Sequence, residues 1–251
     1  KPILGAVLCV QPQGLRHVDP ACELGGFHLV ALVQDQIGYQ NLCQLVTSGI
    51  FEGMRYKPRV DFDTLRSHSA GLIFFTGGRR GLVGHALASG KPEVARTWFD
   101  ELSAFLDTDQ LYLELQDHGL PMQREVNEET RVLARDTGCE LLVSNAVYYQ
   151  GKEDAPVLEA LNAIATGHQL SSKGRLRSPT DQAWLKSEEE MRAVFPDDGG
   201  AIERTAEIGS RCNFQFDFDS YHFPATSPPN PGADATSQPD TDANWEYFFR
   251  A

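Results

Sequence analysis

The feature that most constrains the fold is an alternation of short apolar runs with amphipathic stretches, repeated over residues 1–165. The amphipathic stretches carry apolar residues at helical spacing, whereas the apolar runs are short and end in turn residues, as buried strands do. Strands separated by helices and short links predict parallel strands with right-handed crossovers, in an α/β barrel or an open doubly wound sheet. The predicted strands are "ILGAVLCV" (3–10), "FHLVALV" (27–33), "GLIFFTGG" (71–78), "LYLELQ" (111–116) and "ELLVSN" (140–145).

Single residues predict where the helices begin and end. Asp35 has the side chain of an N-cap, and Pro92 suits the first turn of a helix. A helix over residues 122–137 is expected to stop at Gly138, because glycine readily adopts the left-handed conformation that ends helices. Further helices are predicted at 153–167, 187–195 and 200–212.

Composition limits the class of protein. The formal net charge is −13, from 22 Lys and Arg against 35 Asp and Glu, which argues against a self-sufficient DNA-binding surface. Five cysteines are scattered without metal-type spacing, which favours free thiols in a reducing, cytoplasmic setting. No apolar run is long enough to cross a bilayer, and "KPILGAVLCV" lacks the features of a signal peptide, so no membrane partner is expected.

Polar side chains follow several predicted strands, where parallel α/β proteins place their chemistry. A divalent metal would need several nitrogen or oxygen donors to converge there. Taken alone, His28 beside a buried strand is more often a hydrogen-bonded structural histidine, and Asp117-His118-Gly119 is typical of a turn. The candidate donors are His28, Glu114, Asp117 and His118.

The segment "TGGRRGLVGHAL" (76–87) offers a different kind of site, because its backbone amides and two arginines suit a phosphate at the start of a helix. It matches neither a P-loop nor a dinucleotide-binding fingerprint, so an ordinary strand-to-helix turn is the favoured interpretation. The possible anion contacts are Gly77, Gly78, Arg79, Arg80 and Gly81. Further along, "FDFDSYHF" (216–223) contains an Asp-x-Asp pair, which we interpret as a strand alternating between core and surface. Residues 224–243 are rich in Pro, Ser, Thr, Ala and Asp and predict a linker.

Three long stretches resemble one family. "FHLVALVQDQIGYQNLCQLVTSGIFEGMRYKPRVD" (27–61), "LYLELQDHGLPMQREVN" (111–127) and "WLKSEEEMRAVFP" (184–196) are similar, in the same order, to the PHP (polymerase and histidinol phosphatase) domain of the bacterial DNA polymerase III alpha subunit. The resemblance implies a distorted (βα)7 barrel with parallel strands, here N-terminally truncated and incomplete, followed by short helices leading towards a polymerase palm. It divides the chain into a truncated barrel (1–167), the rest of the PHP region with connecting helices (168–218), a flexible linker (219–243) and the start of a polymerase domain (244–251).

The same resemblance implies that a metal site has been lost. Metal-binding members of the family open with a His-x-His segment, which would lie upstream of Lys1, and His28 matches a retained ligand position. One ligand cannot hold a divalent cluster, so we expect no metal, no cofactor and no catalytic residue in this chain. The positions where family ligands are replaced are Val7, Gly78, Ala146 and Tyr148.

The function implied is that of a non-catalytic module in a replicative DNA polymerase, supporting the polymerase core and docking a proofreading exonuclease subunit or other replicase subunits. DNA contacts and the magnesium of the polymerase reaction would lie outside this chain. Two alternatives stay open at this stage. One is a metal-dependent phosphoesterase or 3′–5′ exonuclease that uses His28, Glu114 and His118, and the other is a phosphate-binding barrel that uses residues 76–81.

Overall fold

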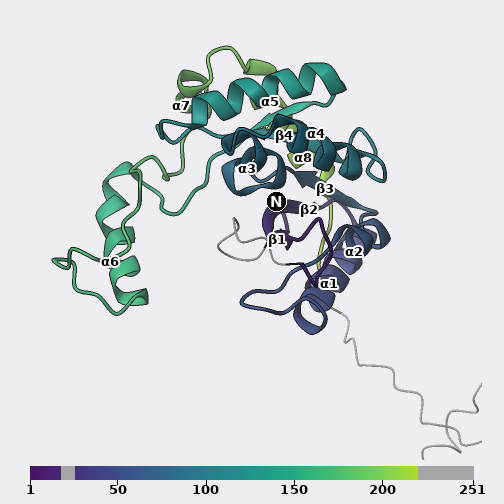
Figure 1. Cartoon of the computed structure of the whole chain (residues 1–251), viewed down its shortest axis with the longest axis horizontal. Helices are drawn as coiled ribbons and strands as arrows, with labels where there is room; N and C mark the ends of the chain where they lie inside the picture. The colour runs from purple at the N-terminus through teal and green to yellow at the C-terminus, as the bar shows by residue number, and fades with distance from the viewer. Residues whose placement is uncertain (18–25, 220–251) are drawn as a thin grey trace, which may run out of the picture. The chain divides into compact units, whose positions relative to one another are not determined.

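A computed structural model of the chain describes residues 1–17 and 26–219. Its centre is a five-stranded sheet with the strands in sequence order (Figure 1). Among the described residues the two outer strands do not pair with each other, so the sheet is open. The predicted α/β class is confirmed, and an open sheet agrees with an incomplete barrel. The strands are β1 (Gly5–Val10), β2 (Phe27–Val33), β3 (Leu72–Phe75), β4 (Leu111–Leu115) and β5 (Leu141–Val143).

Strand β2 runs against the other four, which corrects the expectation that all strands are parallel. It is antiparallel to both β1 and β3, whereas β3, β4 and β5 are mutually parallel. The link from β2 to β3 contains two helices, α1 (Gln36–Phe51) and α2 (Phe62–Ser67), rather than one. The chain therefore leaves and returns to the same end of the sheet, where Val33 pairs with Leu72. A crossover with a single helix would have delivered a parallel strand.

The helix signals read from single residues are confirmed. The Asp35 carboxylate accepts a hydrogen bond from the Gly38 amide at 2.9 Å and caps α1. Pro92 is in the first turn of α4, and Gly138 ends α5 in the left-handed region at φ 71°. The remaining helices are η1 (Gly78–Arg80), α3 (Leu82–Ala88), α4 (Pro92–Ser103), α5 (Gln123–Thr137), η2 (Lys152–Asp154), α6 (Ala155–Ala165), α7 (Glu188–Val194) and α8 (Gly199–Arg211).

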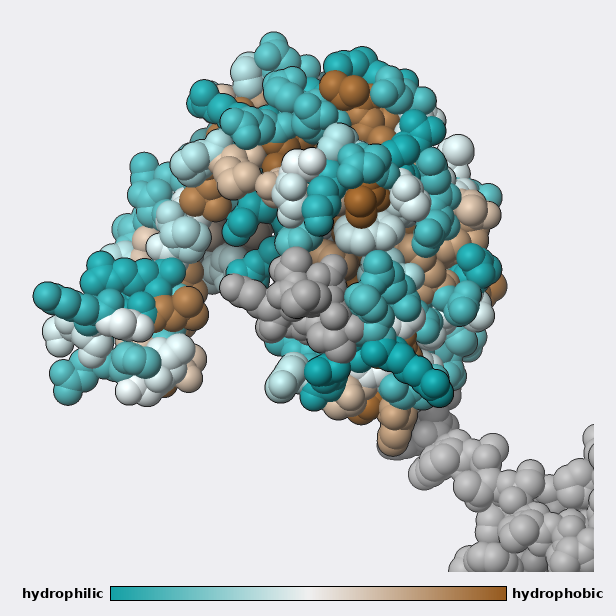
Figure 2. Space-filling view, viewed as in Figure 1, coloured by the Kyte–Doolittle hydropathy of each residue, from teal (hydrophilic) through white to brown (hydrophobic). Residues whose placement is uncertain are grey.

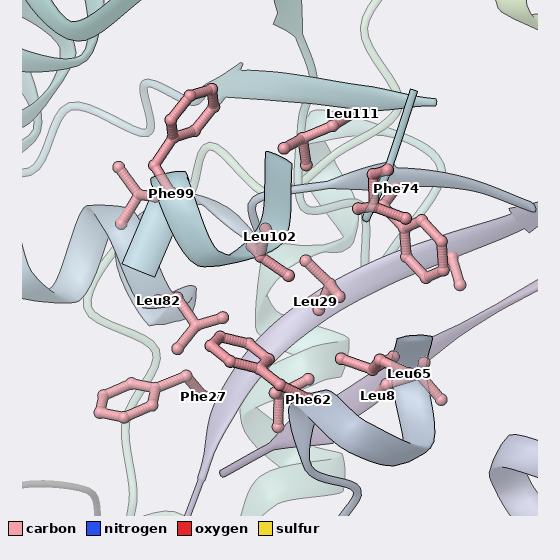
Figure 3. Packing of buried hydrophobic residues seen from close by; sticks show 14 of the residues in the cluster. Leu8, Phe27, Leu29, Phe62, Leu65, Phe74, Leu82, Phe99, Leu102 and Leu111 are labelled. Atoms are coloured by element: carbon pink, nitrogen blue, oxygen red, sulfur yellow. The ribbon is translucent and has the colours of Figure 1, made fainter. Parts of the chain in front are cut away.

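Both faces of the sheet are buried at β3, as its continuous apolar run predicts. Leu72 and Phe74 of β3 join the main core, and Figure 3 shows part of this packing, with side chains from strands and helices interleaved. Ile73 and Phe75 face the other way and pack in a cluster with Ile208 of α8. Helices therefore cover the sheet on both sides and hold its strand ends in place.

Ion pairs fasten α8 to the rest of the fold. Asp198, directly before α8, accepts two hydrogen bonds from Arg131 of α5, at 2.7 and 3.1 Å. The Asp198 side chain is 8% exposed, so this pair is shielded from water, unlike an ordinary surface salt bridge. Arg204 on α8 pairs with Glu140, which precedes β5. The two contacts fix α8 over the β4–β5 side of the sheet.

Helix α6 lies to one side of the sheet and is reached by two extended segments (Figure 1). Its residues Val157, Leu161 and Ile164 are 56%, 56% and 76% exposed, and they recur at helical spacing. Figure 2 shows apolar side chains at the surface of this part of the chain. Isolated exposed apolar residues are common, but a repeated stripe of them on one helix points to a contact surface.

The chain divides into two compact units, Lys1–Gln215 and Phe216–Ala251. The strand expected at 216–223 is not formed at residues 216–219, where the rings of Phe216 and Phe218 contact each other instead. Alternation alone does not make a strand, because strand propensity depends on neighbours to pack against. The rest of that segment, nearly all of the predicted linker and the expected start of a polymerase domain fall at 220–251, outside the described residues. None of the helices at 1–17 and 26–219 has the length and apolar character to span a bilayer.

Candidate functional site

The reversal of β2 brings its first residues to the edge of the sheet where the other four strands end. His28 pairs with Cys9 on β1 and forms an isolated bridge with Gly81, which follows β3. Beside this edge is an open cavity of about 1030 Å³. Gly78 and Gly81 lie outside its lining. The predicted positions that do line it are Val7, His28, Gly77, Arg79, Arg80, Glu114, His118, Ala146 and Tyr148.

Glu114, on β4, is 6% exposed and belongs to the cavity wall. Its Oε1 accepts hydrogen bonds from the Ser144 hydroxyl and from Nε2 of Gln116, the second at 3.1 Å. Its Oε2 is buried and makes no hydrogen bond with the described residues. Burial raises the pKa of Glu114, while these hydrogen bonds and the nearby amides of Gly77 and Gly78 limit the rise. The site therefore favours the neutral carboxyl group more strongly than water does.

Gln116 fills the space beside the glycine turn that follows β3. Gly77 and Gly78 have φ values of 79° and 53°, in the left-handed region that glycine adopts without strain. A Cβ added to Gly78 would lie 2.4 Å from Oε1 of Gln116, so the glutamine occupies the place where a side chain at 78 would go. Nε2 of Gln116 also donates to the Ser144 hydroxyl at 2.9 Å. This one side chain links the ends of β3, β4 and β5, a role that sequence patterns did not reveal.

His118 is a buried histidine, 7% exposed, and each of its ring nitrogens faces a polar group of a neighbouring residue. Its Nε2 accepts a hydrogen bond from the Ala146 amide at 3.1 Å, and Nδ1 lies 3.0 Å from Nε2 of Gln123. Burial is the largest cause that lowers the pKa of His118, so the ring is neutral at physiological pH. The predicted turn around it is confirmed, because Asp117 accepts a hydrogen bond from the Gly119 amide at 2.8 Å.

Other residues of the cavity lining are exposed and lack such a network. Val7 on β1 is 60% exposed and Tyr148 is 66% exposed. The Tyr148 backbone amide is held by the Ala183 carbonyl at 2.8 Å, which places the ring at the cavity wall. Its hydroxyl makes no hydrogen bond within residues 1–17 and 26–219, so the ring is positioned by the backbone alone.

Cations gather near His28. Burial lowers the pKa of His28, and the positive charges of Arg80 and Lys57 lower it further. Lys57 and Arg177 line the cavity together with Arg79 and Arg80. Lys57 and Arg177 were not anticipated from the sequence, since neither lies in a recognisable motif. Only the folded chain brings the segment after α1 and the segment after α6 to the same cavity.

The glycine-rich turn offers less to an anion through its backbone than the sequence suggested. The Gly81 amide donates to the Gly78 carbonyl at 2.9 Å, so it already has a partner. The arginines of the turn, in contrast, are exposed. Any anion bound here would therefore be held mainly by side chains, which are Arg79, Arg80 and the neighbouring Lys57.

Comparison with known proteins identifies the fold around this cavity. Residues 1–118 match the family model of the PHP domain. This part of the chain is a PHP domain. The match includes β1 to β4, the glycine-rich turn, Glu114 and His118, so most of the cavity is built by the PHP domain itself.

The chain is also similar to DNA polymerase III subunit alpha from several bacteria. It is 36% identical to that of Deinococcus radiodurans over 225 residues, covering 86% of this chain and 17% of the relative. It is 33% identical to the subunit of Borreliella burgdorferi over 218 residues, covering 85% of this chain and 19% of the relative. It is 34% identical to the subunit of Thermus aquaticus over 219 residues, covering 85% of this chain and 18% of the relative. The chain thus spans less than a fifth of the length of these relatives, and the similarity extends well beyond the matched PHP domain.

Proposed function

We propose that this chain is the PHP region of a DNA polymerase III alpha subunit that acts in DNA replication, and that it serves as a non-catalytic module. The observation that carries this proposal is the scarcity of metal-binding side chains around the cavity. Within the described residues, no three His, Cys, Asp or Glu side chains are grouped as a metal site requires. Hard or borderline divalent cations need several such donors at once.

The donors that remain are poorly suited to a metal. The Nε2 lone pair of His118 already accepts a hydrogen bond from the Ala146 amide, so it is not directed at the cavity. Burial favours the neutral form of Glu114, whereas a metal ligand must be deprotonated. His28 lies near the positive charges of Arg80 and Lys57, which repel a cation. The residues present do not fit a divalent metal, which supports the non-catalytic proposal over the phosphoesterase alternative.

We further propose that exposed apolar surface on this module packs against the rest of a longer polymerase chain. The relatives are more than five times as long as the matched region, so such a chain offers the necessary surface. The stripe on α6, Val157, Leu161 and Ile164, supports this role. A proofreading exonuclease subunit and other replicase subunits are further partners in this proposal. The magnesium ions of the polymerase reaction and the main DNA contacts would belong to other parts of that chain.

Elemental analysis tests the non-catalytic role directly. The protein is purified without chelator, assayed for zinc, manganese and iron, and given a phosphodiester substrate with added manganese. We expect no stoichiometric metal and no turnover. About one metal per chain, together with turnover abolished by His28→Ala but retained in His68→Ala, would overturn the proposal. His68 is the matched control because it ends α2 and lies outside the cavity lining.

A chimera tests the packing role. Residues 1–215 replace the matching region of the Deinococcus radiodurans subunit, and primer extension and thermal unfolding are measured. We expect Leu161→Asp with Ile164→Asp to weaken assembly and extension in the chimera, because the apolar contact becomes charged. The control is Val132→Asp on α5, which is 40% exposed in the parent. Equal behaviour of the α6 variant and the control would show that the α6 stripe is not the contact.

A further inference from the structure

The cavity concentrates positive charge in a chain that is acidic as a whole. The chain carries 22 Lys and Arg against 35 Asp and Glu, yet the cavity lining has four cationic side chains and a single acid. That acid is Glu114, whose burial favours its neutral form. The local charge is therefore opposite in sign to the net charge, and such a cleft raises the local concentration of anions. The cations are Lys57, Arg79, Arg80 and Arg177.

The side chains of these four cations make no hydrogen bond or ion pair with a described residue, and all four are exposed. Arg177 is nevertheless close enough to Glu159 for its positive charge to lower the pKa of that carboxyl group. Elsewhere in the described chain arginines pair with acids, as Arg96 does with Asp100 at 2.8 Å. Unpaired cations drawn from separate segments around one cavity suit a multiply charged anion, which can accept several charge-assisted hydrogen bonds at once.

The cavity also has an apolar surface next to the cations. Val7, Val147 and Leu176 line it and are at least 45% exposed, and Tyr148 presents an exposed aromatic ring. A small inorganic anion would leave this surface uncovered. A volume of about 1030 Å³ accepts a ligand of nucleotide size. A planar base can stack on a tyrosine ring while its phosphate reaches basic side chains.

We propose that this cavity binds a deoxynucleotide without a metal. Its phosphate contacts Lys57, Arg79 and Arg80 near His28, and its base packs against Tyr148. Among the described residues that line the cavity Glu114 is the only acid, and its Oε1 is held by Ser144 and Gln116 instead of pairing with these cations. The site binds and does not hydrolyse, so it is independent of whether the module packs on a polymerase core.

Calorimetric titration of the 251-residue chain tests the proposal, with EDTA present so that no metal can bridge ligand and protein. The probes are dAMP, inorganic phosphate and deoxyadenosine. We expect dAMP to bind most tightly, because only dAMP contacts both parts of the cavity. Absence of dAMP binding in the millimolar range would overturn the proposal. Equal affinities for phosphate and dAMP would overturn the assignment of a nucleotide. A 5′-phosphorylated oligodeoxyadenylate distinguishes the sources, since tighter binding than dAMP indicates the end of a DNA strand and equal or weaker binding indicates a free nucleotide.

Matched variants separate a specific site from general attraction of anions. Lys57→Gln and Arg80→Gln should each weaken dAMP binding by about tenfold or more, the usual effect of losing a hydrogen bond to a charged group. Lys91→Gln and Arg135→Gln remove the same charge away from the cavity and should change little. Tyr148→Ala should weaken dAMP by about fivefold and leave phosphate unchanged, because stacking concerns only the base. Equal losses in the cavity variants and the controls, with circular dichroism showing all of them folded, would refute the site.

Discussion

The two sides of the cavity use polar residues in opposite ways. On the β4–β5 side, Glu114, Gln116 and Ser144 are joined by hydrogen bonds, and His118 is buried and accepts a hydrogen bond from the Ala146 amide. On the β1–β3 side, Lys57 and Arg80 are exposed and have no ion-pair partner among the described residues. Buried polar groups must be satisfied, so those on the first side stabilise the fold. Exposed cations need no partner to be tolerated, so those on the second side are free to meet a ligand.

The largest predicted effect tests whether the turn after β3 is a rigid support for both sides. In Gly81→Ala the new Cβ would lie 1.5 Å from the Thr76 carbonyl oxygen, and only the backbone can move to relieve this clash. We expect the free energy of unfolding to fall by about 3 kcal/mol, the upper range for overpacking a close contact. Urea unfolding measures it. In the control, Gly200→Ala, the Cβ meets nothing within 4 Å, so stability should be unchanged or slightly higher. A mild effect at position 81 would show that the turn is adaptable.

Replacing each of the two histidines by alanine tests whether the β4–β5 side of the cavity is structural and the β1–β3 side is not. His118→Ala removes a buried ring and leaves the partly buried Ala146 amide without its acceptor, so we expect a loss of about 2 kcal/mol in the free energy of unfolding. His28→Ala removes a half-buried ring beside positive charges, and we expect a loss of less than about 1 kcal/mol. Chemical unfolding of both variants gives the answer. Similar losses would mean that the two sides are equally structural.

The pH dependence of stability sharpens the role of Glu114. Its pKa in the folded chain is raised by burial from an ordinary value of 4.5, so the folded state holds the proton more tightly than the unfolded state. The resulting stabilisation is fully present below pH 4.5 and is lost as pH rises through the folded pKa. Glu114→Gln cannot titrate, so its stability relative to the parent should increase with pH above 4.5 and then level off. A difference that is constant with pH would show that the carboxyl is not perturbed.

The smallest effect is expected on the exposed cations. Lys57→Gln and Arg80→Gln remove no ion pair with a described residue, so the free energy of unfolding should change by less than about 0.5 kcal/mol. Removal of either charge should also raise the pKa of His28, because both charges lower it now. Titration of the His28 ring by NMR measures that shift. A loss of stability above about 1 kcal/mol would place these cations in the structural network instead.

Local features of the fold were predictable because they depend on neighbours in the sequence. The bounds of β2 were predicted correctly at 27–33, and Asp35 caps α1 as its side chain requires. The turn at Asp117 and the end of α5 at Gly138 depend on the conformational preferences of single residues. The candidate donors were found because Glu114 lies on a recognisable strand and His118 follows it, but their hydrogen-bond partners could not be derived from that pattern.

The sequence by itself determined where the five described strands and the helices α1 and α4 to α8 lie, since apolar spacing, caps and glycine turns act over a few residues. It also determined that ligand-type residues are scarce at the strand ends, and the resemblance carried by long stretches such as 27–61 agrees with the PHP match. Only the tertiary structure decided the direction of β2, because that depends on the two-helix link returning to one end of the sheet. The reversal places His28 beside Arg80, and folding brings in Lys57 and Arg177 from segments far apart in the sequence. A binding cavity depends on such long-range contacts, which a pattern of neighbouring residues does not encode.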